Sequence, residues 1–373
     1  MNMRPMLKTA MRRSWRNRES VQFGVDPAHA VVLDSVDGAA AGFLDLLDGT
    51  RGLGPLSREA EALGLEPRQA HRLLGLLAEG GVLDDAAAHS ELAGAVRHRA
   101  AAMDRLRPDL AALSVVHPGP GGAAARIRDR RGARVRVVGA GRVGAAVAAL
   151  LSAAGVGRVE VRDAGRVEPW DVGPCGIPPE QIGERRDAAG RGTVRRAAPD
   201  PRAAALGRRG PRAAPEPGLD LVVLAPRDGL AAYAPEPDEA GPLLTAGIPH
   251  LYTGVLEGMG VVGPLVLPGR TGCAGCLAQQ LTDADPAWPR VLAQLRSGRP
   301  AGVQACDIAL ATAVAGTAAA HVLARLDGRT PPSSGARVEF GLARLTMDIR
   351  PVPGDPRCVC GAAGQNDRVT DRK

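Results

Sequence analysis

The chain has 373 residues, of which 45% are hydrophobic and 23% charged, which predicts a globular protein of two or three domains and excludes disorder throughout. Three Trp, two Tyr and three Phe are too few for a platform that stacks nucleic-acid bases. The net charge of +7 comes almost entirely from arginine, because Lys8 and Lys373 are the only lysines. This excludes a phosphate loop or Schiff base that needs a lysine in the folded body.

The cellular compartment is predicted from three features of the sequence. The N-terminal segment lacks the apolar run of a signal peptide. The longest apolar run, residues 308–320, is shorter than the roughly 20 residues that cross a membrane, so we expect a buried helix there. Six cysteines in a long chain indicate metal binding or catalysis rather than disulfides. We therefore expect a cytoplasmic protein without a membrane segment.

The first elements in chain order predict a small α+β domain over residues 1–88. Its third helix offers only Arg68 and Arg72 near its start and no dense basic face, so DNA binding is the weaker interpretation and a docking module the simpler one. The predicted elements, which together resemble a winged helix, are strands at 21–25, 30–34 and 81–85 and helices at 37–49, 56–64 and 66–81.

A polar helical connector is predicted over residues 89–130, with a proline- and glycine-rich break at HPGPGG, residues 117–122. The second domain is predicted to run from 131 to 373. Within it, residues 184–217 are rich in Arg, Pro and Ala, and the pattern loses its periodicity after Ala198. We expect a loose surface loop in that last part.

The strongest fold signal is a glycine-rich loop between a strand and a helix. A strand at 134–138 is followed by Gly139, Gly141 and Gly144, which form G-x-G-x-x-G, by an alanine-rich helix, and by a second strand at 158–162 that ends at Asp163. The glycines permit a tight turn and close helix–strand packing, and the helix N-terminus offers N–H groups to a phosphate. An acid at this spacing can bind a ribose hydroxyl. The pattern predicts a Rossmann-like doubly wound sheet, whether or not a nucleotide binds.

Four of the cysteines predict a structural zinc site. Cys273 and Cys276 form C-x-x-C, and Cys358 and Cys360 form C-x-C near the end of the chain. Thiolates three residues apart on a tight turn can reach one tetrahedral zinc, and a distant second pair completes the four ligands. The C-x-C spacing is one residue short of the usual one, and free thiols are the alternative.

The other two cysteines and one histidine give weaker signals. Cys306 precedes the apolar helix, where a helix dipole favours a thiolate and the neighbouring Asp307 opposes it. A small buried residue is the alternative interpretation. Cys175 lies in a loop and has no predicted role, and His321 is expected to be a core histidine.

The order of these pieces resembles the ThiF/MoeB family, relatives of the ubiquitin-activating enzymes. The resemblance covers about residues 131–361 and is most specific in GVVGPLVLPGRTGCAGC. It implies adenylation of the C-terminal carboxylate of a small carrier protein with Mg-ATP, often followed by transfer to a cysteine. It also implies a homodimer with a four-cysteine zinc.

Some positions of this sequence match the family motifs. Gly139, Gly141 and Gly144 correspond to the phosphate loop, Asp163 to the ribose-binding acid, and Cys306 to the acceptor cysteine.

Other positions depart from them. Gly165 replaces a second acid, Pro174 replaces a phosphate-binding arginine, and Arg186 replaces a lysine. The family's magnesium-associated acid aligns near Arg227, and Asp228 lies one place away from that position. Either the arginines and Asp228 rebuild an ATP site, or the chain is a degenerate relative.

The N-terminal domain is similar to leader-peptide-recognition domains of ribosomal-peptide biosynthesis. That similarity implies a protein that captures a precursor peptide as an added strand and presents it to a partner such as a cyclodehydratase. The sequence thus leaves open a ThiF-like adenylyltransferase that acts on a carrier or precursor peptide and a non-catalytic presenter. A further alternative is an NAD(P)-dependent oxidoreductase, which the cysteine pairs disfavour. Another is a zinc-containing transcription factor, which the weak basic face disfavours.

Overall fold

The computed structural model describes residues 3–95, 100–200, 218–298 and 303–363. The chain forms two compact units, Met1–Asp129 and Arg130–Lys373. The predicted connector, 89–130, is helical in its described parts except at the predicted break, where residues 117–121 form a turn, and it falls almost wholly in the first unit. The predicted loose loop lies outside the described residues from 201 to 217.

The first unit contains two small sheets and a group of helices. A three-stranded antiparallel sheet has the order β2-β3-β4, and β1 pairs with β5 in a separate two-stranded sheet. The unit's strands are β1 (Pro5–Leu7), β2 (Arg13–Trp15), β3 (Val21–Phe23), β4 (Val31–Leu33) and β5 (Leu83–Asp85). Its helices are α1 (Gly38–Leu46), α2 (Leu53–Ala62), α3 (Pro67–Glu79), α4 (Ala86–Ala95), α5 (Ala100–Val116) and α6 (Gly122–Gly132), the last of which crosses into the second unit.

The helices of this unit begin where the sequence supplies caps. The Asp37 carboxylate accepts the backbone N–H of Ala40 at the start of α1, and Glu66 forms a reciprocal capping box with Gln69 at the start of α3. The apolar faces of the helices then close on β3, with Phe23 and Phe43 fully buried between them. The predicted three helices and the strands before them are therefore present.

Lys8 corrects one inference from the composition. Its side chain is buried, and Nζ donates to the backbone oxygens of Ser114 (2.6 Å) and Pro118 (2.7 Å). Burial lowers the pKa of Lys8, which the nearby Asp84 partly offsets. A lysine thus does lie in the folded body, where it joins the β1 region to the end of α5 and not to a nucleotide loop.

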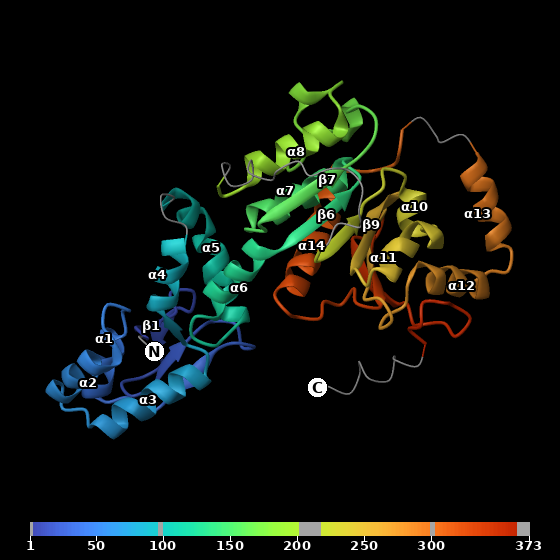
Figure 1. Cartoon of the computed structure of the whole chain (residues 1–373). Coiled ribbons are helices and arrows are strands. Elements are labelled where there is room, and N and C mark those ends of the chain that lie inside the picture. Colours follow the sequence, from blue (N-terminus) through green and yellow to red (C-terminus); the bar gives the residue numbers. More distant parts are fainter. Residues whose placement is uncertain (1–2, 96–99, 201–217, 299–302, 364–373) are drawn as a thin grey trace. The chain divides into compact units, whose positions relative to one another are not determined.

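The second unit is built on a seven-stranded mixed sheet of order β12-β11-β10-β9-β8-β6-β7. Figure 1 labels three of these strands, β6, β7 and β9. The four strands β7, β6, β8 and β9 are parallel, and β10, β11 and β12 continue antiparallel. The strands are β6 (Arg134–Val138), β7 (Arg158–Arg162), β8 (Leu221–Leu224), β9 (His250–Leu256), β10 (Met259–Val266), β11 (Ala336–Gly341) and β12 (Thr346–Pro351).

The parallel half confirms the predicted Rossmann-like arrangement, and the antiparallel half is an addition to it. Glu257 and Gly258 both have positive φ between β9 and β10, which suits a tight hairpin and removes the need for a crossover helix. The helices are α7 (Arg142–Ala153), α8 (Arg186–Ala197), α10 (Gly229–Tyr233), α11 (Gly241–Thr245), α12 (Ala274–Ala284), α13 (Trp288–Ser297) and α14 (Ile308–Leu326).

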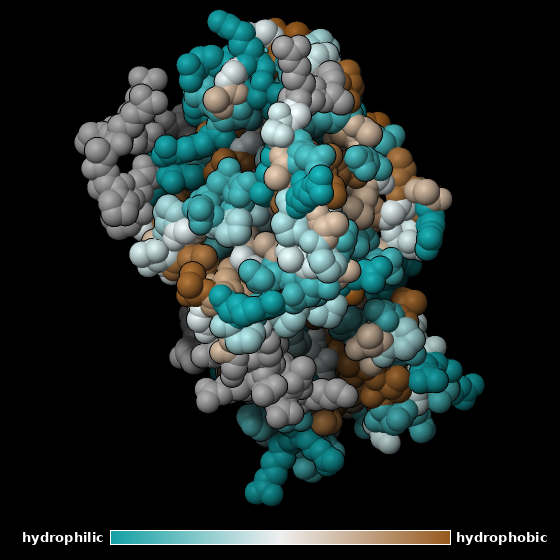
Figure 2. Space-filling model, turned by 90° about the vertical axis from the view of Figure 1, so that its right-hand side faces the viewer, coloured by the Kyte–Doolittle hydropathy of each residue, from teal (hydrophilic) through white to brown (hydrophobic). Residues whose placement is uncertain are grey.

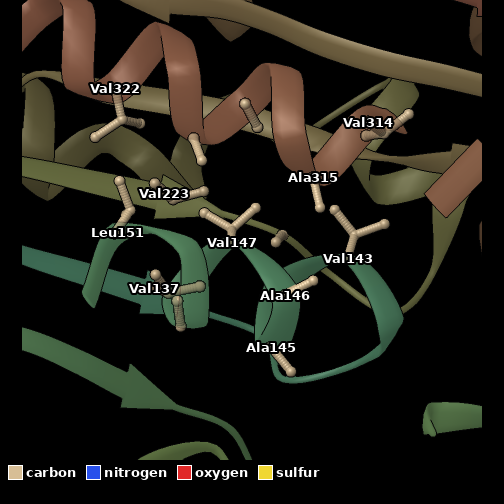
Figure 3. Close-up of a cluster of buried hydrophobic side chains, with 14 of the residues drawn as sticks. Val137, Val143, Ala145, Ala146, Val147, Leu151, Val223, Val314, Ala315 and Val322 are labelled. Atoms are coloured by element: carbon tan, nitrogen blue, oxygen red, sulfur yellow. The ribbon is translucent and has the colours of Figure 1, made fainter. Parts of the chain in front are cut away.

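The core of this unit lies where α7 and α14 pack together on one face of the sheet. Figure 3 shows Val143 and Val147 of α7 beside Val314 and Ala315 of α14. Among the described helices, α14 is long and apolar enough to cross a membrane by length and composition, but one of its faces is buried in this core. This is the buried helix expected over 308–320. On the face shown in Figure 2, hydrophilic residues are spread between the hydrophobic ones.

Candidate nucleotide and metal sites

The glycine loop has the backbone that its sequence predicts. Gly139 has φ +101°, and a Cβ there would lie 1.9 Å from the backbone oxygen of Ala225. A Cβ on Gly144 would lie 2.1 Å from the backbone oxygen of Gly139. Only glycine therefore permits the approach of α7 to the strand ends. The Asp163 carboxylate accepts the N–H of Ala140 (2.6 Å), which ties the end of β7 to the loop.

The charged side chains around this loop are bound to one another. Arg186 Nη1 donates to Asp163 Oδ1 (3.1 Å), and its Nε lies 3.4 Å from Asp171 Oδ2. Arg227 Nε donates to Asp171 Oδ1 (2.8 Å), and Arg227 also pairs with Glu168. We call these five residues the loop ion-pair cluster. Asp163, Asp171 and Arg186 have side chains exposed by 10% or less, so the pairs are held away from solvent.

The two arginines of the cluster also cover the glycines of the site. A Cβ built on Gly141 would lie 3.0 Å from Arg227 Cγ, and one on Gly165 would lie 3.0 Å from Arg186 Nη2. Burial acts to lower the pKa of Arg227, but Asp171 and Glu168 outweigh it and raise the pKa above its ordinary value. Arg227 therefore stays charged against the loop.

The fold implies Mg-ATP at this loop, and the residues present do not fit it in this arrangement. Asp163, the predicted ribose-binding acid, is paired with Arg186, and the Arg227 side chain lies over Gly141, the predicted phosphate position. Asp228, the nearest candidate for magnesium, is exposed and caps α10 by accepting the N–H of Leu230 (2.9 Å). The expected Arg186 and Asp228 roles in nucleotide binding therefore stay predictions.

Cys306 lies just before α14 and is partly buried. Arg142, the residue that follows Gly141 in the loop, donates from Nη1 to the backbone oxygen of Cys306 (2.7 Å). Burial raises the pKa of the Cys306 thiol, Arg142 opposes this and Asp307 adds to it. Asp307 itself caps α14 by accepting the N–H groups of Ala309 and Leu310. The predicted acceptor role of Cys306 is untested by this geometry, although its backbone oxygen does contact Arg142 beside the glycine loop.

The four predicted zinc ligands come together. The sulfur atoms of Cys273, Cys276, Cys358 and Cys360 all lie within 4.8 Å of one another, and the closest pairs are 3.5 Å apart. Four sulfurs around a tetrahedral zinc at ~2.3 Å lie roughly 3.8 Å apart, so the cluster fits that ion. The two cysteine motifs lie about 85 positions apart in the sequence. Cys273 and Cys276 are at the start of α12, and Cys358 and Cys360 are in the C-terminal segment.

Backbone contacts and thiol–thiol hydrogen bonds hold the four sulfurs of this cluster together. Asp355 donates its backbone N–H to Cys276 Sγ (3.4 Å), and Gly275 passes so close that a Cβ would lie 2.8 Å from Cys358 Sγ. The hydrogen bond between the first two thiols raises the pKa of Cys273 and lowers that of Cys276 to about 4. Burial raises the pKa of Cys360 to about 11. Some thiols thus keep protons without a cation, and a bound zinc would displace them.

The sequence did not point to every residue of these sites. Glu168, Asp171 and Arg142 were not predicted from the sequence. The one signal that could have found Arg142 is its position between Gly141 and Gly144 of the glycine motif. Cys175 is exposed, in keeping with its having no predicted role. His321 is partly buried on α14, with Nδ1 2.8 Å from Ser333 Oγ.

The first unit presents a strand edge. In the described part of the chain, β2 and β4 are the outer strands of the three-stranded sheet. The C-terminal end of α3 lies against β4, since a Cβ on Gly80 would be 3.1 Å from Val31 Cγ1. Val32 of β4 is 36% exposed and Leu76 of α3 is 42% exposed. At the other edge a hollow of about 540 Å³ is lined by Trp15, Asn17, Arg18, Val36, Asp37, Gly38 and Ala41.

Comparison with known proteins identifies the family and the fold. The sequence model of the ThiF family matches residues 123–362, which is more than half of the chain. The structure is similar to E. coli MccB with succinimide, at 14% identity and a TM-score of 0.66, over 95% of this chain and 99% of that one.

Two further solved structures extend the comparison. The microcin C7 biosynthetic enzyme MccB in complex with N-formylated MccA is 12% identical with a TM-score of 0.66, over 96% of this chain and 99% of that one. The heterocyclase TruD is 18% identical with a TM-score of 0.61, over 96% of this chain and 43% of that one. No curated protein matches the sequence.

Proposed function

The chain belongs to the ThiF family, and from that premise we propose that it handles a ribosomally made precursor peptide. The N-terminal unit binds the peptide, and the ThiF unit receives its C-terminal part. The observation that carries this proposal is that the likeness to MccB spans both units, over 95% or more of the chain, and one of those structures is a complex with MccA. A ubiquitin-like carrier is the alternative substrate.

The edge of β4 is the proposed peptide site. An edge strand leaves N–H and C=O groups that an extended peptide can pair with, and side chains beside the edge give specificity. Val32 of β4 and Leu76 of α3 both expose apolar surface in this part of the unit. The peptide would therefore add as a fourth strand next to α3.

The peptide site is tested by binding. The probe is a fluorescein-labelled precursor peptide from the open reading frame nearest to the gene, with its N- and C-terminal halves as separate probes. Leu76→Glu and Val32→Glu change exposed residues and are expected to weaken binding of the N-terminal half at least about tenfold, which is ~1.4 kcal/mol. Val25→Glu, at a residue 76% exposed, is the matched control. Loss of binding with Trp15→Glu alone would place the peptide at β2 and contradict the β4 site.

A second candidate function is ATP-dependent adenylation of the peptide C-terminus, with Cys306 as an acceptor thiol. The intact backbone of the glycine loop favours it. The loop ion-pair cluster favours presentation to a partner, for example a cyclodehydratase, instead. Peptide-dependent exchange of pyrophosphate into ATP separates the two, because a presenter gives none.

The proposal includes a homodimer, in the cytoplasm, with one zinc in each chain. In support of a dimer, β12 is an outer strand of the seven-stranded sheet, and its six residues are all exposed. Met347 and Ile349 on it are 60% and 53% exposed. Exposed apolar residues on an edge strand are normally covered. Light scattering on the wild type and on Ile349→Lys tests the dimer, and a monomeric wild type would contradict it.

A further inference from the structure

The loop ion-pair cluster has a property that the family fold does not require. It contains two guanidinium groups, from Arg186 and Arg227, and three carboxylates, from Asp163, Glu168 and Asp171. When all are ionised, these five residues carry one net negative charge. The carboxylates already neutralise the two arginines of this cluster. A triphosphate that approached Gly141 would therefore not be attracted by the cluster.

The cluster is also a steric obstacle. Arg227 reaches across from the segment after β8 and lies on Gly141, with Nε on Asp171, which is 56 residues away in the sequence. Asp171 is almost fully buried and is held in turn by Arg186, and it also accepts the N–H of Glu168 (2.9 Å). Arg227 is therefore anchored on a buried carboxylate at its guanidinium end, and its aliphatic part rests on the loop.

We infer that Arg227 determines the ligand specificity of this loop: held by Asp171 and Glu168, it fills the phosphate position and excludes nucleotides. The glycine loop then remains because α7 needs it to pack on the sheet, as the contacts of Gly139 and Gly144 require. A nucleotide binds only when Arg227 leaves Gly141. This inference goes beyond peptide binding and does not depend on it.

The test is calorimetric titration of the full-length protein with Mg-ATP. The wild type is expected to show no saturable binding. The double variant Arg227→Ala, Glu168→Gln uncovers Gly141, removes one unpaired carboxylate and leaves Asp171 on Arg186, so saturable binding is expected. The matched control is Arg296→Ala, which removes an arginine of similar exposure that pairs with Glu236 on another part of the unit; it is expected to behave as the wild type.

Two results would overturn the inference. One is a wild-type protein that binds Mg-ATP as tightly as the double variant, and the other is a folded double variant that does not bind. If the double variant unfolds at the assay temperature, the single variant Glu168→Gln is tested instead. It keeps the Arg227–Asp171 pair and removes the second carboxylate, that of Glu168, from Arg227. A smaller gain in binding is then expected, and no gain overturns the inference. Peptide binding, measured on the same proteins, is expected to be unchanged, which separates this result from the proposed function.

Discussion

The substitution Gly275→Ala tests the metal cluster through its packing alone. Gly275 is the second residue of α12, between the ligands Cys273 and Cys276. A Cβ at this position would lie 2.8 Å from Cys358 Sγ and 3.5 Å from Cys273 Sγ. The first distance is shorter than real Cβ contacts, so the sulfur, the helix start or both must move.

The size of the effect follows from two opposing contributions. An added methyl in a packed site costs about 1–3 kcal/mol. Replacing glycine by alanine in a helix gains up to ~1 kcal/mol, and less in the first turn. Metal-free sulfurs can move away from the new methyl and metal-bound sulfurs cannot, so the metal-bound state should lose about 1–2 kcal/mol relative to the metal-free state. This corresponds to a fall in zinc affinity of roughly five- to thirty-fold.

Zinc affinity is measured by competition with a coloured chelator on the purified protein. Gly75→Ala is the control, because it lies within α3 and a Cβ there meets nothing within 4 Å. It should leave zinc affinity unchanged and stabilise the protein by up to ~1 kcal/mol. Cys273→Ser should remove the metal. Equal zinc affinity in Gly275→Ala and the wild type would refute the four-sulfur geometry described above.

Three further predictions concern the two units separately. Gly139→Ala should destabilise the protein by at least ~3 kcal/mol in urea unfolding, because its Cβ would meet the Ala225 backbone oxygen; an unchanged midpoint would contradict this. The hydrogen bond to Asp84 raises the pKa of His89, so its stabilisation is complete below the ordinary histidine pKa and is lost as pH rises through the folded value. Melting temperatures should fall over that range, and His89→Ala should remove the fall. Because burial raises the pKa of Cys306, iodoacetamide should alkylate this thiol slowly at neutral pH and faster in alkali, and rapid neutral labelling would contradict it.

The sequence by itself determined the parts that depend on neighbours in the chain. Gly139, Gly141 and Gly144 lie between a strand and a helix, and the backbone freedom and close approach that they provide are local. The pairing of β5 with β1 was not predicted, because a three-residue strand carries too little periodicity and its partner lies about 80 residues away. The six-residue edge strand β12 was not predicted either.

The cysteines and charged residues show what only the tertiary structure decided. Two cysteine pairs suggested a metal because their spacing is itself a ligand pattern, and folding needed only to bring them together. Arg227 carries no such pattern. Whether it holds a phosphate or excludes one depends on Asp171 and Glu168, which reach it through the packing of η1 (Pro169–Asp171) beside the end of β8. The sequence determines the sign of each charge. Which partner neutralises that charge depends on distances in the folded protein.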